Sequence, residues 1–388
     1  MNRDMIENKG DKSSFIRAIS VLVGTVVGAG IFGLPYAFVQ SGFVIGLAYL
    51  LLIAALFLIT KMCYAEVILR TSDDLEMAGY VERYLGKWGK TIITICLILG
   101  IFSALVAYII GVGDFLHSLI GPLLGGNQFF WSIVFWVLTS ILVLIGIGIV
   151  SRLEVLMTFG LVLVVLMVFI VCFPSINFSN LKEINLDLKN IFFPYGPVLF
   201  ALGGASAVPT MRRILKDKSG KLKKAIIVGF SIPVIIYLAF CFSIIGVSGD
   251  QTSEIAIIGL SKIVDGRALI IGSIFGILAM STSFLALSYF LRELFRRDYH
   301  LPLIPAWLIV IAVPAVLFAL GMRSFITVIS FAGGVLSGLQ SIILILTYYQ
   351  AKKKGDRQPE FQVKLSKPLA YFIYLIFIFG ILYQFLYI

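Results

Sequence analysis

The segment Val23-Gly-Thr-Val-Val-Gly-Ala-Gly-Ile-Phe-Gly-Leu-Pro-Tyr-Ala-Phe38 decides the fold, because it combines strong apolar character with residues that interrupt helices. Gly28, Ala29 and Gly30 favour a break in a helix, and Pro35 cannot donate a backbone N–H. Inside a bilayer, a broken backbone is tolerated only where it is buried in protein or lines a cavity. We therefore predict a binding cavity at this break, against the simpler alternative of close packing between helices.

The composition around this segment is that of a polytopic membrane protein. The 388 residues are 60% hydrophobic and only 13% charged, and a soluble domain of this size would need a more polar surface. Each membrane-spanning helix needs about 20 apolar residues. We predict an all-α protein with eleven transmembrane helices, near residues 15–40, 42–69, 91–119, 129–150, 153–173, 191–214, 223–248, 266–292, 303–321, 324–350 and 368–388.

The net charge of +11 follows the predicted topology. With the N-terminus inside, most of the 31 basic residues fall in inner loops, as the positive-inside rule requires. The predicted outer loops hold only five of them: Lys182, Lys189, Lys262, Arg267 and Arg323. We therefore expect the N-terminus inside, the C-terminus outside and no nucleic-acid partner. We expect the membrane to be a prokaryotic cytoplasmic membrane.

Residues for catalysis or transition-metal binding are scarce. The four cysteines are scattered in apolar segments without CxxC spacing, and the only histidines, His117 and His300, have no partner at ligand spacing. No HExxH, GxSxG or Walker-type motif occurs in the sequence. We therefore do not expect an enzyme, nor an organic cofactor.

A second break occupies the corresponding place in the second half of the chain. The sixth predicted helix contains Gly203, Gly204, Ala205 and Ser206, followed by Pro209. Transporters built from inverted repeats place interrupted helices at matching positions and bind substrate between them. We predict a 5+5 inverted repeat with broken helices 1 and 6: a cytoplasmic tail (1–14), a first repeat (15–173), a second repeat (174–350), and a cytoplasmic loop with the eleventh helix (351–388).

These motifs resemble a known family. The run from Gly28 to Phe38 followed by Ser41-Gly42, together with Thr282-Ser-Phe-Leu285, resembles the amino acid/auxin permease group and related bacterial aromatic amino acid permeases. The resemblance covers most of the chain and implies the leucine-transporter-type fold of the amino acid–polyamine–cation superfamily. Neither motif specifies a substrate.

The two breaks can bind an amino acid zwitterion through the backbone alone. The N-terminal end of the helix that begins near Ile31 offers N–H groups to a carboxylate, and helix C-terminal ends at Val26 and at Phe200 to Leu202 offer carbonyls to an ammonium. The resemblance implies the same assignment. The predicted substrate-binding residues are Thr25, Val26, Gly28, Ala29, Gly30, Tyr108, Phe200, Ala201, Leu202, Gly203 and Ser206.

The resemblance also implies an ion site. In sodium-coupled members of this fold, an ion lies between carbonyls of helix 1 and two hydroxyls of helix 8, which here predicts Gly24, Val27, Ala279, Thr282 and Ser283 as ligands. The alternative is that the two hydroxyls bond to their own helix. Proton-coupled relatives carry a lysine in helix 5, which residues 153–173 lack. That absence favours sodium, although proton coupling remains an alternative.

Three ionisable residues in predicted helices required separate interpretation. Asp114 is a candidate gate or proton-relay residue, with a solvated interfacial carboxylate as the alternative. Lys61 and Glu66 lie toward the inner end of helix 2, and Glu66 is spaced i,i+4 from Arg70. We interpret them as a surface or inner-gate ion pair.

These observations predict a monomeric secondary transporter that imports a neutral amino acid by ion-coupled symport, with alternating access around the midplane site. The glycines of the second break leave room for a large or aromatic side chain. One alternative is an amino acid-sensing receptor on a transporter scaffold, although the N-terminal tail is short. A channel is disfavoured, because channels line a continuous pore with polar or charged rings.

Overall fold

The structure is a computed structural model that describes the backbone of residues 2–145, 150–260, 266–297 and 299–387. Every regular element in these ranges is helical. The predicted outer-loop residue Lys262 lies outside the described residues.

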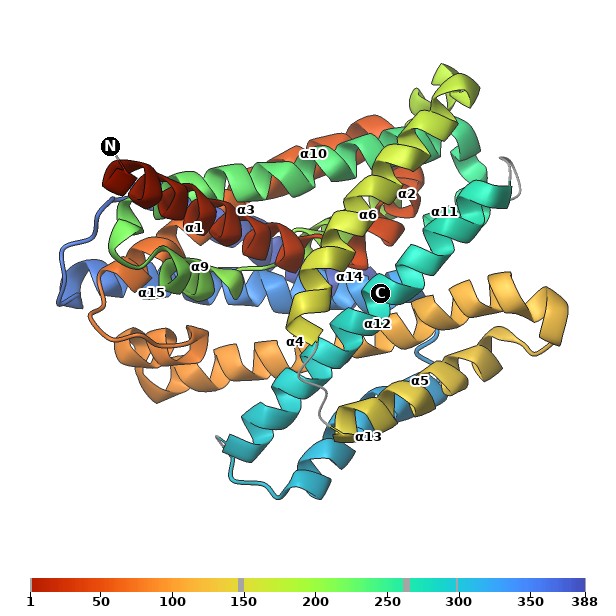
Figure 1. The fold of residues 1–388 in the computed structure, drawn as a ribbon. Helices are drawn as coiled ribbons and strands as arrows, with labels where there is room; N and C mark the ends of the chain where they lie inside the picture. The colour runs from red at the N-terminus through yellow and green to blue at the C-terminus, as the bar shows by residue number, and fades with distance from the viewer. Residues whose placement is uncertain (1, 146–149, 261–265, 298, 388) are drawn as a thin grey trace.

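The elements follow the predicted order of helices (Figure 1). The first half of the chain contains α1 (Asn2–Val26), α2 (Gly30–Ser41), α3 (Phe43–Leu69), α4 (Met77–Leu124), α5 (Gln128–Ile145) and α6 (Val150–Cys172). The middle contains the short η1 (Phe173–Ser175), η2 (Phe178–Leu181) and α7 (Leu188–Ile191), then α8 (Tyr195–Ala201), α9 (Ala207–Leu215) and η3 (Lys216–Lys221). The remainder contains α10 (Leu222–Ser248), η4 (Gly249–Gln251), α11 (Ala256–Leu260), α12 (Gly266–Arg297), α13 (Leu303–Ala319), α14 (Phe325–Phe331), η5 (Ala332–Ser337), α15 (Gly338–Lys354) and α16 (Lys367–Tyr387).

Seven helices in the described ranges are long and apolar enough to cross a membrane, or eight if one bent pair counts as a single span. That pair is Ser13–Val26 with Gly30–Ser41, which meet at an angle of 55°. Two shorter apolar helices, Val162–Ser175 and Leu303–Ala319, accompany them. The all-helical membrane architecture is therefore established, while the count of eleven crossings and the repeat boundaries stay predictions.

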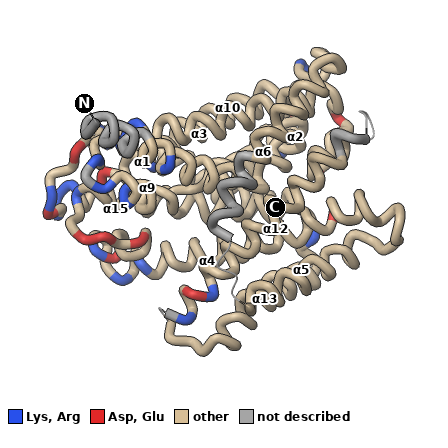
Figure 2. Tube along the Cα trace, in the orientation of Figure 1, with Lys and Arg blue, Asp and Glu red and all other residues tan. Residues whose placement is uncertain are grey.

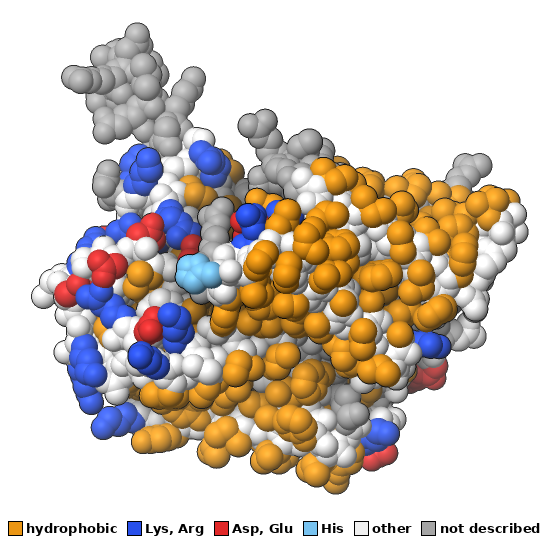
Figure 3. All heavy atoms as spheres, turned by 90° about the horizontal axis from the view of Figure 1, so that it is seen from below, with side chains coloured by type: hydrophobic (Ala, Val, Ile, Leu, Met, Phe, Trp, Pro, Cys, Tyr) orange, Lys and Arg blue, Asp and Glu red, His pale blue; other side chains and the backbone are white. Residues whose placement is uncertain are grey.

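The surface agrees with a membrane protein. Hydrophobic side chains cover a broad band of the molecule, and charged side chains lie toward its ends (Figure 3). Most of the charge gathers at the end that holds the start of α1, α9 and the end of α15 (Figure 2). The basic ends of α9 and α15 contribute there, in agreement with the positive charge predicted for one side of the membrane.

The fourth helix is longer than predicted. The expected span was 91–119, but α4 extends from Met77 to Leu124, because a polar segment continues it beyond the apolar core. Gly86 has a φ of 76°, a left-handed conformation that glycine adopts without steric cost, and it bends the chain between the two parts. The hydropathy of the sequence predicted the apolar part of α4 but not the polar segment that precedes it.

Candidate functional site

Helical structure is interrupted at both clusters of small residues. Helix α1 ends at Val26 and α2 begins at Gly30, while α8 ends at Ala201 and α9 begins at Ala207. The two interruptions are in direct contact: a Cβ added at Gly30 would lie 2.7 Å from Ala201 Cα. The interruption after α8 needs glycine, because Gly204 has a φ of 90° and packs over Val26.

A cavity of about 210 Å³ lies between the two interruptions. Ten of the eleven predicted substrate-binding residues line it, and the exception is Leu202, which is fully buried behind the wall. Its remaining walls come from Gly204 in the second break and from α4, α12, η5 and α15, with the following residues: Cys96, Leu97, Gly100, Ile101, Ala104, Leu287, Ala332, Leu336, Ser337 and Gln340. Sequence reasoning singled out Gly204 as part of the second break but did not find the others, because no local pattern distinguishes a cavity-lining position from an ordinary packing position.

The start of α2 supplies hydrogen-bond donors to the cavity. The N–H of Ile31 bonds to the Gly28 carbonyl at 3.4 Å, and the N–H of Phe32 bonds to the Ala29 carbonyl at 3.1 Å. Among the described residues, no backbone carbonyl accepts the N–H of Ala29 or Gly30. These two donors lie at the positive end of α2 and are therefore suited to bind an anion such as a carboxylate.

The carbonyls at the two breaks already have donors within the protein. The Tyr237 hydroxyl of α10 donates to the Val26 carbonyl at 2.6 Å and lies 3.0 Å from the Ala201 carbonyl. The Lys61 ammonium donates to the Leu202 carbonyl at 3.0 Å, and the Gly203 N–H donates to the Phe200 carbonyl at 3.3 Å. A carbonyl oxygen has two lone pairs, so each can accept one more hydrogen bond from an ammonium ligand.

The two sides of the cavity differ in their packing. On the α2 side the ring of Phe32 packs edge-on against Phe115 and Phe240, with centroids 5.4 and 6.4 Å away. By contrast, Thr25 in α1 and Ser206 before α9 line the cavity and are exposed. The exposed wall residues therefore lie at α1 and α9, two helices that extend toward the end where the basic residues gather (Figure 2).

The predicted ion ligands lie on two helices. Gly24 is in α1 and Val27 lies in the first break, whereas Ala279, Thr282 and Ser283 are in α12. The Thr282 hydroxyl donates to the carbonyls of Leu278 and Ala279, both at 3.0 Å. Helix α6 contacts both helices that carry predicted ligands, α1 and α12. These contacts do not show that the five predicted ligands surround one point, so the ion site stays a prediction.

The predicted ion pair of Glu66 with Arg70 forms, but neither Glu66 nor Lys61 lies at the surface. Glu66 does pair with Arg70 at 2.8 Å, but its side chain is fully buried and also accepts the Val363 N–H. Lys61 is buried and lies at the second break, away from this pair. Charge patterning along one helix could not reveal a contact 141 residues away in the sequence.

Asp114 lies on α4 and is half-buried. It interacts electrostatically with Glu254, a carboxylate that accepts hydrogen bonds from the Ser324 hydroxyl at 3.1 Å and from the Ile326 N–H at 3.2 Å. Asp114 is not among the residues that line the cavity between the two breaks.

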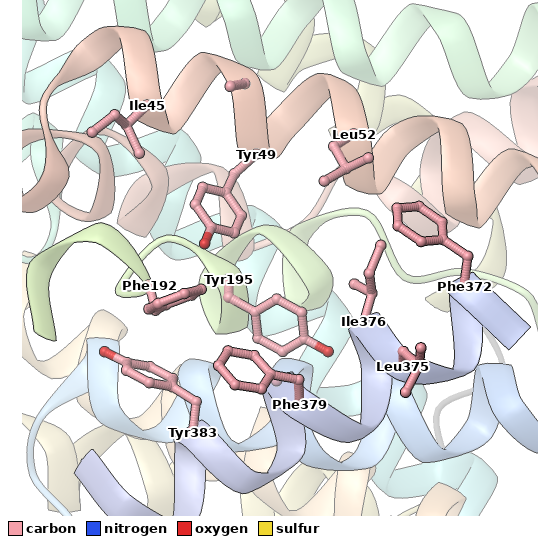
Figure 4. Close-up of a pocket in the computed structure, with 12 residues that line it drawn as sticks. Ile45, Tyr49, Leu52, Phe192, Tyr195, Phe372, Leu375, Ile376, Phe379 and Tyr383 are labelled. Carbon is pink, nitrogen blue, oxygen red and sulfur yellow. The ribbon is translucent and has the colours of Figure 1, made fainter. Parts of the chain in front are cut away.

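A larger crevice has a different character. It measures about 550 Å³ and lies between α3, α8 and α16, where aromatic and aliphatic side chains line it (Figure 4). Leu52, Leu375 and Phe379 in its walls are exposed on helices suited to face lipid. It lacks the paired N–H and carbonyl ends of the breaks, so we assign the binding site to the smaller cavity.

Comparison with known proteins defines the class. The crystal structure of MhsT in complex with L-phenylalanine superimposes on this chain with a TM-score of 0.64, covering 96% of this chain and 98% of that one, at 17% sequence identity. The fold is therefore that of the leucine-transporter-type membrane proteins, as the sequence motifs implied. The chain belongs to the tryptophan/tyrosine permease family, whose model matches residues 11–384.

Three curated proteins similar in sequence to this chain are named as amino acid transporters or transport systems. The chain is 25% identical over 358 residues to the tyrosine-specific transport system 1 of Haemophilus influenzae, covering 87% of this chain and 88% of the relative. It is 29% identical over 353 residues to the tyrosine-specific transport system 2 of the same organism, covering 85% and 84%. Glutamine transporter 2 of Aliivibrio fischeri is 23% identical over 348 residues, covering 87% and 89%.

Proposed function

We propose that this chain is a secondary active transporter that imports a neutral amino acid together with an ion, by alternating access around the cavity between the two breaks. The observation that carries the proposal is the juxtaposition of free N–H groups at Ala29 and Gly30 with the carbonyl ends at Val26 and Ala201. This arrangement is complementary to the two charged groups of a zwitterion. The amino acid transporters among the relatives support the same substrate class.

The cavity wall supports a neutral side chain. None of the residues that line the cavity is Asp, Glu, Lys or Arg. A charged side chain on the amino acid substrate would therefore find no opposite charge in the cavity wall. Gly100 and Gly28 leave open space, since an added Cβ at either would meet no atom within 4 Å. A large or aromatic side chain is therefore our preferred substrate feature.

Sodium is the coupling ion that we propose, with the carbonyls of Gly24, Val27 and Ala279 and the hydroxyls of Thr282 and Ser283 as ligands. The Thr282 hydroxyl uses its proton toward its own helix, but its oxygen lone pairs remain able to coordinate a cation. Proton coupling is the alternative, and Asp114 is then the residue to examine.

Two measurements test the proposal. Purified protein is screened by thermal shift against the twenty amino acids with and without sodium, because a ligand that binds the folded state raises its apparent stability. Proteoliposomes then measure uptake of each hit under separate sodium and proton gradients. Stabilisation together with gradient-driven uptake is expected. Binding without uptake would indicate a sensor, and the absence of any amino acid hit would contradict the assignment.

A further inference from the structure

Lys61 is a buried cation at the second break. Its side chain extends from α3, is only 2% exposed, and donates from Nζ to the Leu202 carbonyl at 3.0 Å. The ammonium also lies over the rings of Phe230 and Phe57, with centroids 4.2 and 4.8 Å away. Burial disfavours the charged form of the amine, whereas the hydrogen bond and both ring faces favour it.

No acidic side chain neutralises this ammonium. Among the described residues, none of the salt bridges includes Lys61. Glu66 is on the same helix, but it is held by Arg70 and by the Val363 N–H. A buried charge without a counter-ion is costly, and inside a membrane protein it usually marks a functional site.

The compensating negative charge comes from the backbone. Leu202 directly follows the last residue of α8, so its carbonyl lies at the negative end of that helix dipole. Position 202 also begins the interruption whose Gly203, Gly204 and Ser206 line the substrate cavity. The cation therefore acts on the end of α8 that shapes the site.

A second, smaller cavity adjoins this contact. It measures about 100 Å³, and its wall includes Lys61, Thr60 and Ser341. It shares six wall residues with the substrate cavity: Leu97, Gly203, Gly204, Ser206, Ser337 and Gln340. The Lys61 side chain therefore lies next to the wall of the proposed substrate cavity.

We propose that Lys61 is a tethered cation, a positioning residue that occupies a cation site at the carbonyl end of α8 and thereby fixes the Leu202–Ser206 interruption in the geometry that binds substrate. The effect of Lys61 on substrate binding rests on the proposed function. The contact of Lys61 with the carbonyl end of α8 does not depend on that function.

Chemical rescue tests the cation site without any amino acid. Lys61→Ala removes the ammonium and three methylene groups, which n-propylammonium can replace. We expect n-propylammonium to raise the melting temperature of Lys61→Ala in a saturable manner, with no such effect on wild type. Tetramethylammonium, which has no N–H to donate, serves as the control solute. Lys353→Ala, at an exposed position near the end of α15, is the matched control variant.

The positioning role is tested by binding of L-tyrosine and L-glutamine to full-length protein. Because a charged hydrogen bond to the interruption is lost, Lys61→Met is expected to weaken binding about tenfold or more, whereas Lys61→Arg keeps the charge and restores most of the affinity. Wild-type affinity in Lys61→Met, or the same response to both ammonium ions in Lys61→Ala, would overturn the inference. Failure of wild type to bind any amino acid would instead count against the proposed function, and the rescue experiment would still decide on the cation site.

Discussion

At the scale of single residues, the glycines of the first break have different constraints. A Cβ at Gly28 would enter open space, whereas a Cβ at Gly30 would lie 2.7 Å from Ala201 Cα and 2.9 Å from its Cβ. Gly28 therefore leaves room for a ligand, and Gly30 allows the two breaks to approach. The same residue type thus serves binding at one position and packing at the other.

Gly28→Leu is expected to reduce amino acid binding at least about tenfold while the protein stays folded, because the new side chain would project into the cavity. Calorimetric titration of monodisperse variant measures the affinity. Gly30→Ala is the comparison variant and should lower thermal stability, since its Cβ meets backbone. Affinity of Gly28→Leu within a few-fold of wild type would contradict the site assignment.

Tyr237 joins the two breaks through one hydroxyl. Tyr237→Phe leaves the Val26 and Ala201 carbonyls without this donor and is expected to destabilise the protein by about 1–3 kcal/mol. Tyr64→Phe is a matched control, because the Tyr64 hydroxyl is buried and has no hydrogen-bond partner among the residues that the structure describes. Denaturation in detergent compares the two variants, and equal stability losses would show that the bridging hydroxyl contributes nothing specific.

At the scale of elements, the local sequence predicted the helices and the places where they are interrupted. Small residues at 28–30 and 203–206 determine the breaks because they act through their own backbone, and the structure ends α1 and α8 there. Long-range partners could not be predicted in this way. Lys61 and Tyr237 reach the breaks from α3 and α10, and only the packed structure shows which helix faces supply these donors.

The ion site belongs to this scale, because it requires α1 and α12 to act together. Replacing both Thr282 and Ser283 by alanine should weaken sodium binding and substrate affinity in parallel, since two oxygen ligands are lost. Reciprocal linkage requires substrate to tighten sodium by the same factor as sodium tightens substrate. Proteoliposome uptake under separate gradients provides the measurement. Full accumulation driven by a proton gradient, with a double variant that behaves as wild type, would exclude sodium and direct attention to Asp114.

At the scale of the whole molecule, charge asymmetry predicts the orientation in the membrane. Charged side chains gather at the end that holds the start of α1 (Figure 2), and the exposed wall residues of the proposed substrate cavity, Thr25 and Ser206, adjoin α1 and α9. If the cavity is reached along these helices and this end is cytoplasmic, as the positive-inside rule predicts, the structure represents the state that is open to the cell interior. An experiment that determines the orientation in the membrane therefore also determines the side to which the cavity opens.

Cysteine labelling determines the orientation. All four native cysteines are buried, so a cysteine-free background is the appropriate starting point. We expect Gly220→Cys to react only from inside and Gln251→Cys only from outside, because these exposed positions lie at opposite ends of α10. Gly220 is a better reporter than the neighbouring Ser219, which is only 2% exposed. Eleven crossings with the N-terminus inside further require a residue such as Tyr387, at the end of α16, to be labelled from outside once it is replaced by cysteine. Labelling of Tyr387→Cys from the same side as Gly220→Cys would contradict the odd number of spans, and reversed reactivity of the α10 pair would place the open cavity on the outer face.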